Sequence, residues 1–136
     1  MNQINDYFTT IYYYLHPENQ GAISHQAVRI LQLIQKEQCV TVQDVAKKLH
    51  ISQNTASEHI KKLEKNHWIV KKRSIQDQRV VHIHLTDEGL QIVKRNTELD
   101  EVKLRKVLKE LNETQQQEIK QAFKLLSEVA KNVYND

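Results

Sequence analysis

The chain has 136 residues, of which 39% are hydrophobic, a size suited to one compact domain or to a smaller domain with added helices. With only two glycines and one proline, it favours long helices over a strand-rich fold. Its single cysteine, Cys39, excludes an intrachain disulfide and a cysteine-based zinc cluster. No apolar run approaches the roughly 20 residues that span a bilayer, and the first fifteen residues lack the features of a secretory signal. We therefore expect a cytoplasmic protein.

Residues 3–15 predict a helix with apolar or aromatic side chains on more than one face. These side chains are Ile4, Tyr7, Phe8, Ile11, Tyr12, Tyr14 and Leu15. Such a helix needs more than one neighbour to cover it. Pro17 and Gly21 then mark a loop.

A second helix is predicted from the N-cap Ser24 to about Lys36. Its buried stripe is expected at Ala27, Val28, Leu31 and Ile34. The short run CVTV is long enough for a single strand, and we expect Cys39 to be buried there.

A third, short helix is predicted from Thr41 through Leu49, because Thr41 and Asp44 have the spacing of a capping box. A fourth follows the N-cap Ser52, with Ala56, Ile60 and Leu63 on its buried side. Its opposite side is polar in the first turn and cationic later. These positions are Asn54, Thr55, Ser57, Glu58, Lys61, Lys62 and Lys65.

Residues 68–72 and 80–85 predict two paired strands, and the segment that connects them contains no glycine or proline. Residues 61–79 hold seven basic residues against two acidic ones, a net charge of +5, while the whole chain carries +3. Concentrated positive charge is typical of a protein that binds a polyanion. The charge pattern alone fits a solvated, lysine-rich helix face equally well.

Two more helices are predicted in the remaining third of the chain. Thr86 is the expected N-cap of a long helix that runs to about Leu111. Thr114 and Gln117 form a second predicted capping box, ahead of a helix with a strong apolar stripe. That stripe consists of Ile119, Phe123, Leu126, Val129, Ala130 and Val133.

The third and fourth helices have the layout of a helix-turn-helix, in which the second helix enters the DNA major groove. Gln53 and Asn54 could pair with an adenine edge, and Thr55 and Ser57 could donate to bases or phosphates. Lys61 and Lys62, further along, are placed to contact phosphates. The alternative is an ordinary capped amphipathic helix with a lysine-rich outer face.

The segment ISQNTASEHIKKLEKNHWIVKKRSIQDQRVVHIHLTDEG resembles the winged helix-turn-helix core of the multiple-antibiotic-resistance regulator (MarR) family. The features that carry the resemblance are the serine-capped helix, the strand IVKKR, the Asp-x-Arg motif DQR and the junction LTDEG. The direct match covers about 65 residues, Ser24 to Gly89, and the flanking helices match in pattern.

The resemblance implies roles for residues of the hairpin, or wing. Arg79 would enter the minor groove, Asp77 would hold its guanidinium by a charge-assisted hydrogen bond, and Lys71 and Arg73 would contact phosphates. One departure is the pair Asn66 and His67, where the family usually has glycine. We expect Asn66 to adopt the left-handed conformation at the end of the helix.

The resemblance also implies a mainly α fold with a small β-hairpin wing. Residues 24–86 would form the DNA-binding lobe, while residues 1–22 and 87–136 would form a helical dimerisation region. We expect a homodimer that represses transcription from a pseudo-palindromic double-stranded operator, with half-sites about one helical turn, ~34 Å, apart. No cofactor is expected.

The resemblance further implies release from DNA by a small, often aromatic effector. Candidate residues for the effector site are Tyr12, Tyr13, His16, His25 and Arg29. For each of them the ordinary explanation is favoured over an effector site: packing at a dimer interface for the tyrosines and a solvated loop position for the histidines.

Three alternatives stay open. The regulator could respond to an oxidant through Cys39, although no basic residue lies within two positions of it to activate the thiol. It could respond to a metal through His82 and His84, which share one strand face without an obvious acidic or cysteine partner. A winged helix could also bind protein in place of DNA. An enzyme is not expected, because the chain has no glycine-rich phosphate loop and no nucleophile-base set.

Overall fold

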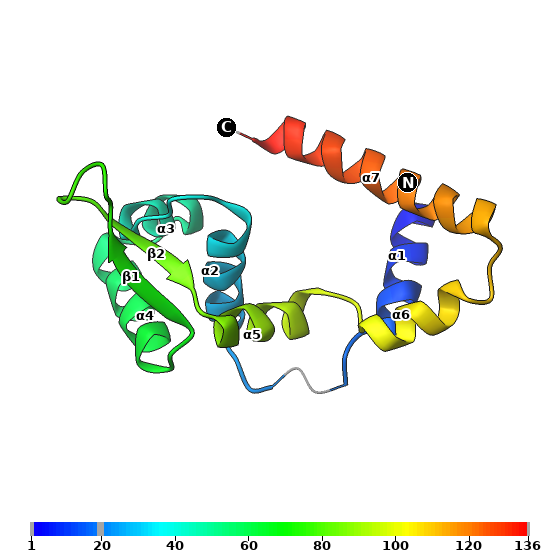
Figure 1. Ribbon diagram of the computed structural model, residues 1–136, viewed down its shortest axis with the longest axis horizontal. Coiled ribbons are helices and arrows are strands. Elements are labelled where there is room, and N and C mark those ends of the chain that lie inside the picture. The colour runs from blue at the N-terminus through cyan, green and yellow to red at the C-terminus, as the bar shows by residue number, and fades with distance from the viewer. Residues whose placement is uncertain (1, 19–20, 136) are drawn as a thin grey trace. The chain divides into compact units, whose positions relative to one another are not determined.

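The computed structural model describes residues 2–18 and 21–135 and divides the chain into two compact units. Residues 16–98 form the central unit, and residues 1–15 with 99–136 form the helical unit. The elements labelled in Figure 1 are α1 (Asn2–Leu15), α2 (His25–Lys36), α3 (Val42–Leu49), α4 (Gln53–Lys65), β1 (Ile69–Arg73), β2 (Val81–Leu85), α5 (Asp87–Thr97), α6 (Glu101–Leu108) and α7 (Glu113–Tyr134). The expected mainly α fold with one β-hairpin is confirmed.

The hydrophobic core lies in the central unit, where α2 to α5 and the hairpin each contribute buried side chains. The core residues are Ile30, Leu31, Ile34, Val40, Val45, Leu49, Ala56, Ile60, Leu63, Ile69, Ile83 and Val93. The stripe predicted for α4 is buried in full. In α2, Ile30 is fully buried although it was not predicted, whereas Ala27 and Val28 are only half-buried.

Side-chain caps begin the helices of the central unit as predicted. The Ser24 hydroxyl accepts a hydrogen bond from the Ala27 N–H at 3.1 Å. Thr41 and Asp44 form the full capping box, with distances of 2.9 and 3.2 Å. These bonds satisfy N–H groups that have no partner within the helix.

The prediction for Asn66 was wrong. Asn66 stays helical, at φ −78° and ψ 0°, and His67 takes the left-handed conformation at φ 63°. The Trp68 N–H then donates to the Leu63 carbonyl at 3.1 Å, and the His67 N–H to Glu64 at 3.0 Å. This pair of bonds is a Schellman motif, and it places the left-handed residue one position later than the sequence suggested.

The expectation that Cys39 is buried was also wrong. Cys39 is exposed and has a φ of 58°, and Val40 after it is buried and forms an isolated bridge with Ile83. The left-handed turn lets the chain reverse after α2 while Val40 enters the core. The side chain of the residue before Val40 is therefore left in solvent.

The hairpin pairs β1 and β2 antiparallel, with Ile69 opposite Leu85 and Arg73 opposite Val81. Because side chains alternate along a strand, the core-facing side holds Ile69 and Ile83. The outer side holds Val70, Lys72, His82 and His84. The two histidine rings meet edge to face, with centroids 6.5 Å apart, and His84 is exposed.

The long helix predicted from Thr86 to about Leu111 is in fact two helices, α5 and α6. Glu98 leaves α5 with extended backbone, and the Asp100 carboxylate accepts the Lys103 N–H at 2.9 Å to begin α6. A new N-cap inside a polar stretch therefore ends one helix and starts another. In addition, α5 packs against α2 and belongs to the central unit.

The helical unit contains α1, α6 and α7, and none of the residues described in these helices is buried. Large apolar side chains are exposed along α1 and α7 in particular. They include Ile4, Tyr7, Phe8, Tyr13, Tyr14, Ile119, Phe123, Leu125, Leu126, Val129 and Val133. Within the described ranges, no helix combines the length and the apolarity needed to cross a membrane.

The junction LTDEG fastens the start of α5 to the turn after α4. The Thr86 hydroxyl donates to the His67 carbonyl at 2.7 Å, and the Thr86 N–H donates to the Trp68 carbonyl at 3.0 Å. Gly89 lies so close to this turn that a Cβ added to it would be 2.8 Å from the Trp68 carbonyl carbon and closer still to its oxygen. Glycine is therefore required here by space.

We predict that Gly89→Ala lowers the free energy of unfolding by at least ~1–3 kcal/mol, because the new methyl group must displace backbone atoms. Thermal or urea unfolding followed by circular dichroism measures the change. Gln91→Ala, at an exposed position of the same helix, is the matched control and should be nearly neutral. Equal stability of Gly89→Ala and the parent would show that α5 is free to move away from Trp68.

Candidate nucleic-acid interface

The first turn of α4 presents two exposed amide side chains, Gln53 and Asn54. The neighbouring hydroxyls are used for capping: Ser52 accepts the Thr55 N–H at 3.1 Å, and its own hydroxyl donates to the Thr55 hydroxyl at 2.8 Å. Thr55 and Ser57 are half-buried. Of the polar residues predicted here, the two amides are thus the most available to a partner, and Ser52 and Thr55 fix the backbone that displays them.

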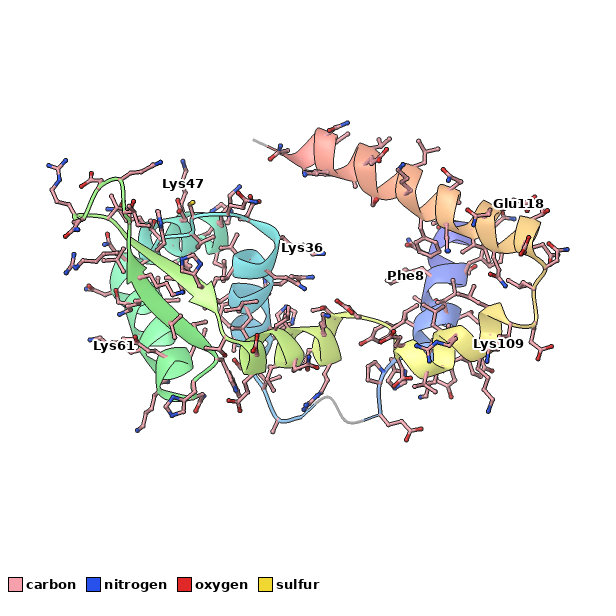
Figure 2. All side chains as sticks on the ribbon, viewed as in Figure 1. Phe8, Lys36, Lys47, Lys61, Lys109 and Glu118 are labelled. Atoms are coloured by element: carbon pink, nitrogen blue, oxygen red, sulfur yellow. The ribbon has the colours of Figure 1, made fainter. Side chains whose placement is uncertain are left out.

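Later turns of α4 carry the exposed cations Lys61, Lys62 and Lys65. Figure 2 shows Lys61 on the outer side of α4, away from α2. Lys71 on β1 lies 3.7 Å from the Glu64 carboxylate, so an ion pair links the strand to α4. Both groups of this pair are more than a third exposed, and pairs of this kind contribute little to stability.

The connection between β1 and β2 projects from the helices of the central unit (Figure 1) and holds the predicted pair Asp77 and Arg79. The Arg79 Nε donates to Asp77 Oδ1 at 3.1 Å, and Nη2 donates to Oδ2 at 3.3 Å. The Arg79 backbone N–H also donates to Oδ1, at 3.1 Å. Although 91% of the Arg79 side chain is exposed, its guanidinium is thus held by two parallel bonds.

Two further side chains order the same connection, and sequence reasoning gave neither of them this role. The Ser74 hydroxyl accepts the N–H groups of Gln76 and Asp77, at 3.2 and 3.3 Å. The Arg73 Nη1 donates to the Gln78 carbonyl at 2.8 Å. We had expected Arg73 only as a phosphate contact. Serine at the start of a turn was a usable signal, because its hydroxyl often bonds to the backbone two or three residues later.

The candidate effector residues are divided between the two units. Tyr12 and Tyr13 belong to α1 in the helical unit, whereas His16, His25 and Arg29 belong to the central unit. Tyr13, His25 and Arg29 are exposed, and Tyr12 and His16 are half-buried.

A cavity of about 440 Å³, which no sequence pattern indicated, lies within the central unit where the end of α2 faces β2 and the start of α5. Its apolar lining includes Ile34, Ile83 and Leu90, and its polar lining includes Cys39, His84 and Asp87. In the described ranges, no three His, Cys, Asp or Glu side chains come together as they would to hold a metal ion.

The hydrogen bonds from the Arg79 side chain, and secondly from its backbone, hold the pKa of the Asp77 carboxyl below its ordinary value of 3.8. Whatever the Asp77–Arg79 pair contributes to the order of the connection between β1 and β2 is therefore fully present at neutral pH. It is lost only as the pH falls through the lowered pKa of Asp77.

We predict that the carboxyl ¹³C shift of Asp77 titrates below 3.8 and that Arg79→Ala moves the midpoint of this titration upward. Lys72→Ala removes a nearby charge but none of these bonds, and should leave most of the depression intact.

Comparison with known proteins shows which family the chain resembles. The family model described as "Transcriptional regulator SarA/Rot" matches residues 16–96, which is more than half of the chain. No protein with a curated functional description matches.

The chain is also similar to solved structures. Streptococcus pneumoniae FabT in complex with DNA is 26% identical, with a TM-score of 0.60 over 97% of this chain and 98% of that one. A Lactococcus lactis ZitR mutant is 25% identical, with a TM-score of 0.56 over 93% and 94%. Staphylococcus aureus MepR bound to ethidium bromide is 23% identical, with a TM-score of 0.62 over 94% and 92%, and shows likeness of fold.

These structures are winged-helix regulators of the MarR type, as the sequence resemblance implied, and the matched family consists of transcription regulators rather than enzymes. The chain belongs to the SarA/Rot family of transcriptional regulators, whose winged helix is of the MarR type.

Proposed function

We propose that this regulator binds double-stranded DNA of defined sequence as a homodimer and represses transcription from a pseudo-palindromic operator. The observation that carries the proposal is the exposed, doubly hydrogen-bonded guanidinium of Arg79 at the end of a projecting hairpin. A rigidly held cation is suited to a narrow minor groove, whose negative potential attracts it. The similarity to FabT, solved in complex with DNA, supports this reading.

In this proposal, α4 is the recognition helix and enters the major groove. Gln53 and Asn54 read base edges, and an amide that pairs with both N6 and N7 selects adenine. Ser52 and Thr55 mainly hold the start of the helix, and Ser57 contributes at the edge of the contact. Lys61 and Lys62 bind phosphates, which fixes the position of the helix without reading sequence.

The wing contributes Lys71, Arg73, Asp77 and Arg79. Arg79 enters the minor groove, and Asp77 keeps its guanidinium aligned. Arg73 holds the Gln78 carbonyl at 2.8 Å, so its part is to position the wing as well as to add charge near the phosphates. Lys71 lies near the DNA backbone, where its pairing with Glu64 reduces its net attraction for phosphate.

The helical unit is proposed to be the dimerisation region. With no buried residue among those described in α1, α6 and α7, this unit has no core of its own, and its apolar side chains need a covering surface. A second copy of the same helices can supply that surface in a two-fold arrangement. The two-fold symmetry would then place two copies of α4 about one helical turn, ~34 Å, apart.

Repression is proposed to end when a small, aromatic effector binds, with Tyr12, Tyr13, His16, His25 and Arg29 as the residues to test. An effector can release DNA only if it binds the DNA-free geometry more tightly than the DNA-bound one. Because transcription factors act on the chromosome, the proposed site of action is the cytoplasm.

Selection of DNA fragments from a random-sequence pool tests the central proposal. We expect the retained duplexes to share an inverted repeat. We also expect the affinity to fall steeply with salt: a plot of log K against log[salt] should have a slope of about −0.9 for each phosphate that the protein neutralises. A retained pool without a common motif would contradict sequence-specific binding. Salt-independent capture of a protein partner would favour an interaction module.

Arg79→Ala should weaken binding to the selected duplex by ~1–3 kcal/mol and make the affinity less dependent on salt. Because the side chain is exposed, the free energy of unfolding should change little. Fluorescence anisotropy titrations at several salt concentrations measure both effects. Arg95→Ala removes the same charge from an exposed position on α5 and is the matched control. Equal losses in the two variants would mean that only net charge matters.

Phe123→Asp should convert the homodimer into a monomer that no longer binds the full operator, because a charge would be buried in the dimer interface. Phe123 is 52% exposed in the isolated chain, so the substitution leaves its own fold intact. Light scattering coupled to size-exclusion chromatography gives the mass. Gln121→Asp introduces the same charge on another side of α7 and should remain dimeric. A dimeric Phe123→Asp protein would place the interface elsewhere.

A further inference from the structure

The tip of the wing displays an apolar side chain that the proposed function does not yet use. Ile75 is 98% exposed, more than any other large hydrophobic residue described. Single exposed apolar residues are common on protein surfaces and usually need no explanation. The surroundings of Ile75 set it apart, because it lies in the projecting segment that also carries Arg79.

The exposure of Ile75 is fixed by the hydrogen bonds around it. On one side, the Ser74 N–H donates to the Val80 carbonyl at 2.8 Å, and the Ser74 hydroxyl accepts the N–H groups of the two residues after Ile75. On the other side, the Val80 N–H donates to the Asp77 carbonyl at 3.0 Å. A backbone tied at both ends of the turn cannot easily fold Ile75 back onto the core.

We propose that Ile75 is a DNA contact of the wing, which packs its apolar surface against the deoxyribose walls of the minor groove beside Arg79. The inference rests on the proposed function and deepens it. Proteins that enter the minor groove often combine a cation with an apolar side chain, because the groove is electronegative but walled by sugar C–H groups. Ile75 and Arg79 lie on either side of Asp77 in the same ordered turn, so one insertion can bring both to the groove.

The charge of the surrounding surface favours DNA over a protein as the occupant. Lys72, Arg73 and Arg79 are exposed around the same hairpin, with Asp77 as the acidic residue between them. A basic surface with one apolar point fits a polyanion that also offers C–H surface. An apolar protein groove would have to cover these cations at the cost of removing their water.

The salt dependence of DNA binding should distinguish the contribution of Ile75 from that of Arg79. Burial of an isoleucine against sugars releases water and few ions, whereas an arginine displaces cations from the DNA. Ile75→Ala should therefore weaken binding to the selected duplex roughly tenfold at every salt concentration, with an unchanged slope. Arg79→Ala should reduce the slope, and Ile75→Leu, which keeps the apolar surface, should bind within about threefold of the parent.

The experiment is a set of anisotropy titrations of the full chain and these three variants on one selected duplex over a range of salt concentrations. Unfolding curves of all four proteins should superimpose within error, since both side chains are exposed. A parent chain that binds no selected duplex would overturn the proposed function. Normal parent binding with undiminished binding by Ile75→Ala would overturn this inference alone. The inference would also be overturned if Ile75→Ala lowered both the affinity and the salt dependence of binding, as Arg79→Ala is expected to do, because Ile75 would then act through the arginine.

Discussion

The architecture of the central unit depends on one close contact, between the start of α5 and the turn that ends α4. Gly89 lies against the backbone of Trp68, and Thr86 bonds to the carbonyls of His67 and Trp68. This contact sets where the hairpin leaves α4 and where it returns. Because β1 begins directly after Trp68 and β2 ends directly before Thr86, the direction of the wing relative to α4 is fixed at its base. In the proposed complex with DNA, one rigid body would therefore make both the major-groove and the minor-groove contacts.

At its far end the wing has the opposite requirement, since it must be ordered without a core around it. Side chains replace the glycine and proline that usually shape a hairpin turn: Ser74 and Asp77 bond to backbone N–H groups, and Arg73 bonds to a carbonyl. A wing built in this way can be long and still hold Arg79 in one orientation. The same bonds keep Ile75 in solvent, where its apolar surface is available to a partner.

The helical unit contrasts with the central unit in how its apolar residues are used. Among the described residues, twelve apolar side chains form the core of the central unit, while those in α1, α6 and α7 are exposed or half-buried. Amphipathic helices of this length gain most of their stability from packing on an apolar face. In the proposed dimer, the DNA-binding fold does not depend on the partner subunit, whereas the pairing of the two operator half-sites does.

The sequence by itself determined most of the elements whose signals are local, although the capping box predicted at Thr114 and Gln117 was wrong, since Asn112 and Gln115 form the box that begins α7. Capping residues fixed the starts of α2, α3 and α4, the spacing of Ala56, Ile60 and Leu63 fixed the buried side of α4, and Asp-x-Arg predicted the Asp77 and Arg79 pair. Tertiary structure decided what depends on distant partners. His67 takes the left-handed conformation in a turn whose His67 and Trp68 carbonyls accept hydrogen bonds from Thr86, far along the chain. Cys39 is exposed because Val40 pairs with Ile83. α5 ends early: Val93 is its last buried residue, and Asp100 begins another helix. Periodicity carries no information on such contacts, since residues far apart in the chain set them.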